Sequence, residues 1–484
     1  MSVLLWVFIA TELTSAMRII DKLEKYSHRG PLINIGADNM LRRDVLAGLG
    51  ATTTLPLIGC KNKAKPTPKK PHIFYLCVDD LGTQLGCYGN PFVHSPNFDA
   101  FAQESVLFEN AHCQVAICSA SRTAILTGMR PEETGLWPLN HDWKARLPNV
   151  LSLPEHLMAQ GYSTISVGKI WDPRSGDGTQ LGWTEKKEEW GIDDAALAID
   201  TLDQHLAKDK PIAFFFGTQA PHCPWEPSDA GLAPYESMNI QAEGPGRTLP
   251  WEYQQTCYGA GTETLSEAQA SDITRRYYGA VTDIDKVIGD FINALKARNL
   301  YDSSIIVLWS GDHGFHLGQN DHWGKWTNYT ASTRIPLMIR APGMTPGLRS
   351  PRIVESVDMY ATLLDLANLS QPSHTLQGRS FAELLRNPSA NHKSYAFSLW
   401  GFDVDKDVNN LDYSVKTERY NFIKWRSSGY NGLLRRGVNE NAPYTLFDII
   451  NDPNETHDIS KENPDVVATF TAVLEKGWRA NSSL

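Results

Sequence analysis

The chain alternates apolar runs with amphipathic stretches of helical length, and no other feature constrains its fold as strongly. The first apolar run, HIFYLCVDD at residues 72–80, ends in two acids. A continuous apolar run of this length is typical of a parallel strand that is buried on both faces. Four units of helix followed by strand come after it, at residues 95–108, 153–169, 199–222 and 287–314.

This order predicts an α/β fold, a doubly wound and mostly parallel sheet sandwiched by helices. After residues 356–369 the pattern changes to short alternating strands and a terminal helix at 466–478. Such strands predict a small antiparallel sheet. We therefore expect a large α/β domain at residues 71–387, which carries the polar candidate residues, and a C-terminal α+β subdomain at 388–484.

The N-terminal region has the order of a bacterial export signal. Residues 40–60 contain paired arginines, a short apolar run and LIGC, which resemble a twin-arginine leader and a lipobox with Cys60 as the lipidated residue. The run is too short to span a bilayer, and residues 61–70 form a basic, proline-containing linker. We expect an exported protein in the periplasm or at the cell surface, in contact with the membrane only through a lipid on Cys60.

Residues 1–39 precede a plausible start at Met40, and we interpret them as a mis-assigned upstream extension. The alternative, that MSVLLWVFIA is itself a weak export signal, stays open. The net charge of −10 and the lack of a long Lys and Arg stripe argue against nucleic acid as a partner. The seven cysteines are scattered, so a disulfide-stapled scaffold is not expected.

Two strand ends carry acids that are suited to a cation. Asp79 and Asp80 end the first strand, and Asp312 and His313 in SGDHG end a strand much later in the chain. In a parallel sheet these ends can be neighbours. Adjacent carboxylates repel each other unless something neutralises them, and a divalent cation with oxygen ligands is the usual remedy. Calcium fits better than zinc because no cluster of Cys and His has zinc spacing; for the Asp79–Asp80 pair alone, a solvated strand end is the more common explanation.

The segment CSASRTAILTG at residues 118–128 reads as the start of a helix. A side chain at this end of a helix meets free N–H groups and the positive end of the helix dipole, which stabilise an oxyanion. Arg122 lies four residues after Cys118, on the same helix face. By itself this pattern more often means packing and a helix cap.

Together these motifs resemble the type I, formylglycine-dependent sulfatases of the alkaline-phosphatase-like superfamily. CSASR corresponds to the family motif Cys-x-Pro-Ser-Arg, with Ala120 in place of proline, a replacement that some bacterial maturation enzymes accept. VDD, SPNFDAFA, CSASR, VGK, APH, SGDHG and LFDIINDPNET occur in the family's order over nearly all of residues 71–460. The pair Asp312–His313 and the run DHWGKWTNY make the chain most similar to the iduronate-2-sulfatase branch.

The resemblance implies that Cys118 is oxidised to Cα-formylglycine, whose hydrate has two hydroxyls, one to attack sulfur and one to expel sulfate afterwards. It implies one calcium ion per chain, held by Asp79, Asp80, Cys118, Asp312 and His313. Arg122 would steady the hydrate. Lys169 and Lys325 would bind sulfate oxygens that gain charge in the transition state, and His222 would donate a proton to the leaving oxygen.

The implied enzyme is a sulfuric ester hydrolase acting on a sugar of a sulfated polysaccharide, either glycosaminoglycan-like or algal. Its partners would be a sulfated oligosaccharide and a formylglycine-generating maturation enzyme. Asp172 stands where this branch usually has His; either it contacts the substrate sugar or the alignment shifts locally. Two alternatives remain: a phosphomonoester or phosphonate hydrolase of the same superfold, and a non-catalytic glycan-binding lipoprotein.

Overall fold

The computed structural model describes residues 70–187, 193–208, 210–249, 264–401, 410–426 and 443–483. The predictions for residues 1–39, for the export signal at 40–60, for the lipid on Cys60 and for most of the linker lie outside these residues. Residues Lys69–Leu484 form one compact unit. Within the described ranges, no helix is both long and apolar enough to cross a membrane.

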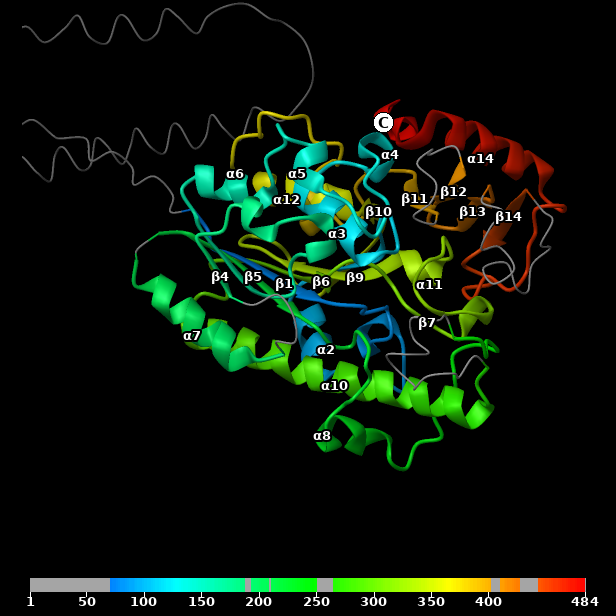
Figure 1. The fold of residues 1–484 in the computed structure, drawn as a ribbon, viewed down its shortest axis with the longest axis horizontal. Helices are drawn as coiled ribbons and strands as arrows, with labels where there is room; N and C mark the ends of the chain where they lie inside the picture. The colour runs from blue at the N-terminus through cyan, green and yellow to red at the C-terminus, as the bar shows by residue number, and fades with distance from the viewer. Residues whose placement is uncertain are drawn as a thin grey trace, which may run out of the picture. The chain divides into compact units, whose positions relative to one another are not determined.

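An eight-stranded sheet with the order β10-β2-β9-β6-β1-β5-β3-β4 forms the centre of this unit (Figure 1). In that order its strands are Leu348–Glu355, Val106–His112, Arg334–Arg340, Ile305–Ser310, Ile73–Val78, Ile212–Thr218, Ser163–Gly168 and Glu185–Lys187. β9 runs antiparallel to both of its neighbours, whereas all the other pairings are parallel. The predicted doubly wound, mostly parallel sheet is confirmed.

Helices cover both faces of the sheet, as the apolar strands require. One face carries α2 (Pro96–Gln103), α7 (Ala195–Leu206) and α10 (Glu267–Ala297), and the other carries α3 (Cys118–Thr127), α6 (Leu153–Ala159) and α12 (Met359–Leu366) (Figure 1). Alternate residues of β1 belong to two separate cores: Phe74, Leu76 and Val78 to one, and Ile73, Tyr75 and Cys77 to the other. Both faces of this strand are therefore buried in apolar cores.

The remaining short elements lie in the connections. They are α4 (Pro131–Thr134), α5 (Trp143–Arg146), α8 (Asp229–Leu232), α11 (Thr330–Thr333) and a hairpin of β7 (His316–Leu317) and β8 (Trp323–Gly324). The hairpin and α11 occupy the connection between β6 and β9. This connection begins with Gly311-Asp312-His313 and also contains Lys325, so it carries three predicted site residues.

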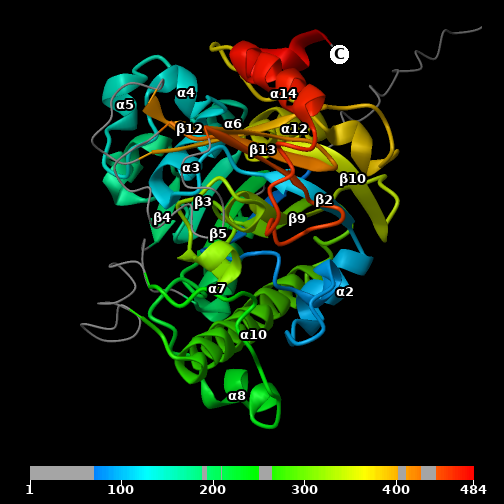
Figure 2. The ribbon, with the colours of Figure 1, turned by 90° about the vertical axis from the view of Figure 1, so that its right-hand side faces the viewer.

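The predicted small antiparallel sheet is confirmed as β11 (Ala396–Trp400), β12 (Asp412–Lys416), β13 (Tyr420–Lys424) and β14 (Tyr444–Asp448). It packs against α14 (Pro464–Lys476) (Figure 2). A β-bridge joins Leu399 of β11 to Val115, in the segment that leads into α3. The small sheet therefore supports the start of α3 directly. The proposed domain boundary near residue 388 falls just before β11.

Candidate active site

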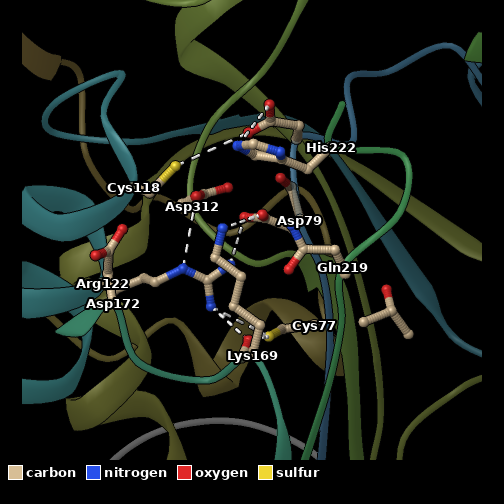
Figure 3. A network of polar contacts seen from close by, with 12 residues as sticks. Cys77, Asp79, Cys118, Arg122, Lys169, Asp172, Gln219, His222 and Asp312 are labelled. Carbon is tan, nitrogen blue, oxygen red and sulfur yellow. Dashed lines mark hydrogen bonds and ion pairs between the residues drawn. The ribbon is translucent and has the colours of Figure 1, made fainter. Parts of the chain in front are cut away.

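The carboxyl ends of four neighbouring strands bring the predicted residues together. In the sheet, Val78 at the end of β1 pairs with Thr218 of β5 on one side and with Ser310 of β6 on the other. The side chains that follow these strands and β3 therefore meet at one edge, as open α/β sheets favour. Figure 3 shows them: Asp79 after β1, Lys169 after β3, Gln219 and His222 after β5, and Asp312 after β6.

Cys118 is the first residue of α3, and Ile117 in extended conformation precedes it as the N-cap, without a side-chain capping bond. Cys118, which we expected near the helix cap, is therefore the first residue of the helix, and Ile117 is the N-cap. All ten residues of α3 are buried, and Cys118 is 1% exposed. Burial raises the pKa of the Cys118 thiol well above its usual value, so an unmodified cysteine here is held as the thiol.

Arg122 is a buried cation at the centre of the site (Figure 3). Its Nη2 donates to Asp79 Oδ1 at 2.7 Å, and its Nε lies 3.5 Å from Asp312 Oδ2. Nη1 donates to the carbonyl oxygens of Lys169 at 2.8 Å and of Ile170 at 3.1 Å. Arg122 therefore neutralises two acids and fixes the backbone after β3 at the same time.

Two lysines pair with the two adjacent acids. Lys169 Nζ donates to Asp79 Oδ2, and Lys325 Nζ donates to Asp80 Oδ1 at 2.8 Å and to Cys118 Sγ at 3.0 Å. Burial by itself would raise the pKa of both carboxyls, but the nearby cations outweigh it and hold the pKa of Asp79 well below, and that of Asp80 below, the usual value. Both acids are therefore ionised inside the protein.

Four of the five predicted metal ligands form one cluster: Asp80, Cys118, Asp312 and His313 offer ligand atoms within 4.8 Å of one another. His313 Nδ1 donates to the Gly314 carbonyl oxygen at 2.9 Å, which leaves the Nε2 lone pair facing the cluster. Nε2 lies 3.5 Å from Cys118 Sγ, 3.4 Å from Asp80 Oδ1 and 3.3 Å from Asp312 Oδ2. Burial lowers the pKa of His313, which favours the neutral, metal-ligating form.

A further observation suits this cluster to a cation. Asp312 Oδ2 is buried and accepts no hydrogen bond, and its ion-pair partner Arg122 Nε lies 3.5 Å away, so a directly bound cation would complete its surroundings. The fifth predicted ligand, Asp79, lies beside the cluster, where Arg122 and Lys169 bind its two oxygens.

His222 lies at the edge of the site with its side chain 13% exposed. Its Nδ1 donates to the Cys223 carbonyl oxygen at 2.7 Å, and its Nε2 lies 3.9 Å from Asp80 Oδ2. The backbone contact orients the ring so that Nε2 faces the acids. His222 therefore lies beside the acids of the site, and its role as a proton donor stays a prediction.

Asp172 is buried, and Arg174 binds both of its oxygens. Oδ1 accepts from the Arg174 backbone N at 3.0 Å and from Nε at 2.9 Å, and Oδ2 accepts from Nη2 at 2.6 Å. Burial would raise the pKa of Asp172, but the hydrogen bond and charge of Arg174 lower it. The acid that replaces the expected His thus has its charge balanced within its own turn.

Sequence reasoning missed three residues at this site. Arg174 carried no motif signal. Gln219, whose buried Oε1 has no hydrogen-bond partner, was detectable because it directly follows an apolar strand. The third is Gly311, where a Cβ would lie 2.5 Å from Arg122 Nη2, so only glycine lets the backbone pass the guanidinium without displacing it. The motif SGDHG contains this glycine, but the sequence does not indicate its contact with Arg122.

Comparison with known proteins agrees with this geometry. A family model described as sulfatase matches residues 71–369, and one described as N-sulphoglucosamine sulphohydrolase, C-terminal, matches residues 318–478. Human iduronate 2-sulfatase is 27% identical to this chain, over 86% of the chain and 96% of the relative. The first model spans the whole cluster from Asp79 to Lys325.

Two solved structures share the fold. One, described as a complex with its substrate D-glucosamine-2-N,6-O-disulfate, has a TM-score of 0.69 at 22% identity and covers 86% of this chain and 99% of that chain. A phosphonate monoester hydrolase of Agrobacterium radiobacter has a TM-score of 0.66 at 20% identity and covers 85% of this chain and 96% of that chain. Proteins with different named activities thus use this architecture.

Proposed function

The chain belongs to the sulfatase family of sulfuric ester hydrolases, and from this premise we propose that it removes sulfate from a sugar of a sulfated polysaccharide, either glycosaminoglycan-like or algal. The observation that carries the proposal is the position of Cys118, with Lys325 Nζ at 3.0 Å among buried acids. The named activity of human iduronate 2-sulfatase and the disulfated glucosamine bound in the similar structure support a sugar sulfate as substrate.

We further propose that Cys118 functions as Cα-formylglycine and that one Ca²⁺ ion is held by Asp79, Asp80, residue 118, Asp312 and His313. Asp312 Oδ2, which accepts no hydrogen bond, and His313 Nε2, which faces Asp80, Cys118 and Asp312, support a cation here. Formylglycine supplies a hydrate with a nucleophilic hydroxyl and a second hydroxyl for product release, and calcium withdraws charge from sulfate oxygens. Asp79 would bind the ion only through an oxygen that also accepts from Arg122 or Lys169.

The chain's own side chains have complementary tasks in this proposal. Lys169 and Lys325 present ammonium groups where the sulfate oxygens gain charge, so they stabilise the transition state more than the substrate. As an imidazolium, His222 would donate its Nε2 proton to the leaving sugar oxygen. Arg122 holds Asp79 and Asp312 in place beside residue 118.

Processing and location belong to the same proposal. A formylglycine-generating enzyme would act on CSASR, in which Ala120 replaces the usual proline. Export through the signal at residues 40–60, with Cys60 as the lipid attachment site, would place the enzyme in the periplasm or at the cell surface, where sulfated glycans are met.

The test combines mass and activity. Protein from its native host is digested with trypsin, and the mass of the peptide that contains residue 118 is measured; formylglycine is expected, and an unmodified thiol would contradict the mechanism. The same protein is assayed on sulfated disaccharides and an aryl sulfate, with EGTA and then with added Ca²⁺. Chelation should lower turnover, and Ca²⁺ should restore it.

A second candidate function is hydrolysis of phosphate or phosphonate monoesters, which the similarity to the Agrobacterium radiobacter enzyme favours. Aryl sulfate and aryl phosphate are therefore compared at equal enzyme concentration. A higher kcat/KM on the phosphate ester would favour this second function over the sulfatase proposal. Absence of turnover on both esters, in protein that carries formylglycine and calcium, would favour a non-catalytic glycan-binding protein.

A further inference from the structure

A cavity of about 600 Å³ lies apart from the residues of the active site. Residues from five segments line it: 83–92, which follow β1, and 239–243, 319–320, 330–334 and 453–455. None of the predicted site residues is among its lining residues. The volume is within the range of sites that hold a small molecule or one part of a polymer. The cavity is therefore a candidate for a second binding site.

The cavity begins close to the active site although it shares no residue with it. Gln84 in its wall is four residues after Asp80, and four residues of chain span at most about 14 Å. Gln84 Nε2 also donates to the carbonyl oxygen of Phe315 at 3.2 Å, two residues after His313. Two segments that carry predicted metal ligands therefore continue into the wall of the cavity or contact it.

The two acids of the cavity already have donors from the chain itself. Glu243 accepts from the Tyr278 hydroxyl at 2.5 Å and from Gln319 Nε2. Glu455 accepts from the Thr330 backbone N at 2.6 Å and from its hydroxyl at 2.9 Å. Burial raises the pKa of both carboxyls, which lowers the negative charge that they carry. Neither acid needs a cation from outside.

Arg334 is the one Lys or Arg among the lining residues, and it has no acid of its own. Its Nε donates to the Glu109 carbonyl oxygen at 2.7 Å, and its guanidinium lies 5.8 Å from the centre of the Tyr88 ring. The Glu109 carboxylate binds Arg349 instead, at 2.8 Å. Within the described part of the chain, no carboxylate forms an ion pair with Arg334, and its Nη1 and Nη2 make no hydrogen bond. Burial lowers the pKa of this guanidinium, as it does for a cation that lacks a counter-charge.

The lining residues indicate which kind of ligand would supply that charge. A guanidinium with two available N–H groups binds a carboxylate or a sulfate group well. Phe92 lines the same cavity and is 52% exposed, and the exposed amides of Asn239 and Gln241 lie in its wall. The C–H faces of a sugar ring pack on aromatic rings, and its hydroxyls bond to amides. A sugar with an acidic group combines these contacts.

We propose that this cavity binds a sugar unit that carries a carboxylate or a sulfate group, through Arg334 and Phe92, at a place separate from the site of cleavage. The inference goes beyond the proposed function and takes from it only the expectation that the protein meets acidic glycans. Such a site would hold a polysaccharide on the enzyme between cleavage events. Binding there needs neither formylglycine nor a metal ion.

The test measures binding of three tetrasaccharides to the full chain by calorimetry. The first alternates glucuronate and N-acetylglucosamine, the second consists of galactose with sulfate esters, and the third is the same galactose chain without sulfate. The chain carries Cys118→Ala, so that the probes stay intact. At least one acidic probe should bind about 10- to 100-fold more tightly than the neutral one, and it identifies the group as carboxylate or sulfate. A neutral probe that binds as tightly as both acidic probes would overturn the inference.

Two variants in the same background locate the binding. Arg334→Ala should raise the Kd of the tighter acidic probe by about 10- to 100-fold, toward that of the neutral probe. Phe92→Ala should raise the Kd of acidic and neutral probes alike, by about 3- to 10-fold. Phe92 is 52% exposed, so this variant keeps the fold even if Arg334→Ala does not. Unchanged binding in Phe92→Ala and in folded Arg334→Ala would contradict the proposal.

The matched control is Arg349→Ala. It removes the same charge next to the same Glu109, but Arg349 does not line the cavity, and its side chain is 49% exposed. Its replacement should leave the Kd of each probe unchanged. Losses as large as those of Arg334→Ala would mean that overall charge, and not the cavity, attracts the glycan.

Turnover of an aryl sulfate separates this inference from the proposed function. In the chain with Cys118, Arg334→Ala and Phe92→Ala should leave kcat/KM on this small ester unchanged. A protein that cleaves no sulfate ester, but whose glycan binding depends on Arg334, would disprove the proposed function and keep the cavity site. A protein that cleaves the ester and binds all probes equally well with and without Arg334 and Phe92 would do the reverse.

Discussion

Arg122 has buried acids on two sides, Asp79 and Asp312. Replacing Arg122 with alanine leaves these carboxylates without a shared buried partner, which should lower the free energy of unfolding by about 3–5 kcal/mol. Chemical denaturation followed by circular dichroism measures this loss. Arg298→Ala removes the partly exposed pair of Arg298 with Asp203 instead and should cost about 1 kcal/mol or less. Similar losses in the two variants would show that Arg122 has no special role in balancing charge.

Lys325 contacts both Asp80 and Cys118. Because the proposed mechanism places its ammonium group where the sulfate oxygens gain negative charge, Lys325→Ala should lower kcat on an aryl sulfate by about 100- to 1000-fold. Steady-state kinetics check this, with Lys144→Ala as the control, since Lys144 forms a partly exposed pair with Glu155, donates to the Val150 carbonyl oxygen and lies over the Trp143 ring. A rise in KM at constant kcat would instead make Lys325 a simple binding residue.

At the residue scale, prediction from sequence worked where a residue follows a strand. Asp80, Asp312 and His313 could be placed together because carboxyl ends of parallel strands share an edge. The partner of Asp172 could not, since the bond to Arg174 depends on how residues 173–175 turn against α3. The contacts of both Asp79 oxygens with Arg122 and Lys169 were equally hidden, because residues after two separate strands and in one helix form them.

At the element scale, the turn between β6 and Asp312 has to pass Arg122. A Cβ at Gly311 would lie 2.5 Å from Nη2, closer than a Cβ normally approaches. Gly311→Ala should therefore displace the guanidinium and lower kcat by about 10- to 100-fold, since small misplacements in a site are costly. The control is Gly161→Ala: Gly161 has a φ of 91° with open space around it, so its change strains the backbone without touching the site.

Equal kcat in the Gly311→Ala variant and the parent enzyme would mean that Arg122 moves without consequence for catalysis.

The elements themselves were largely predictable, because apolar runs and helical periodicity are local signals. The reversed direction of β9 and the strand order were not, since they depend on which faces the whole chain buries together.

At the scale of the whole molecule, the small sheet and the start of α3 form one packed unit. Leu399 is buried in a cluster with Val115, Ile117 and Ala120. Leu399→Ala should lower the free energy of unfolding by about 2–5 kcal/mol and also reduce kcat, because the segment before Cys118 loses its support. Leu446→Ala is the matched control: it is buried in the same sheet but packs in the cluster that contains α14, so it should cost stability without reducing kcat.

Urea denaturation and kinetics on the same preparations separate the two effects. An unchanged kcat in Leu399→Ala would show that the small sheet only stabilises the chain. The sequence pattern predicted this sheet but not its contact with α3, because the bridge between Val115 and Leu399 joins segments far apart in the chain.

The burial of α3 also sets an order of events during synthesis. Cys118 is 1% exposed, and Leu399 of β11, which is made long afterwards, packs in one cluster with Ile117 and Ala120 on either side of it. An enzyme that oxidises so buried a residue has to reach it before α3 packs into the fold, so the proposed oxidation belongs to the interval before folding is complete. If the chain is exported already folded, Cys118 must be oxidised in the cytoplasm, before export. Only cells with a maturation enzyme in the cytoplasm would then produce an active enzyme.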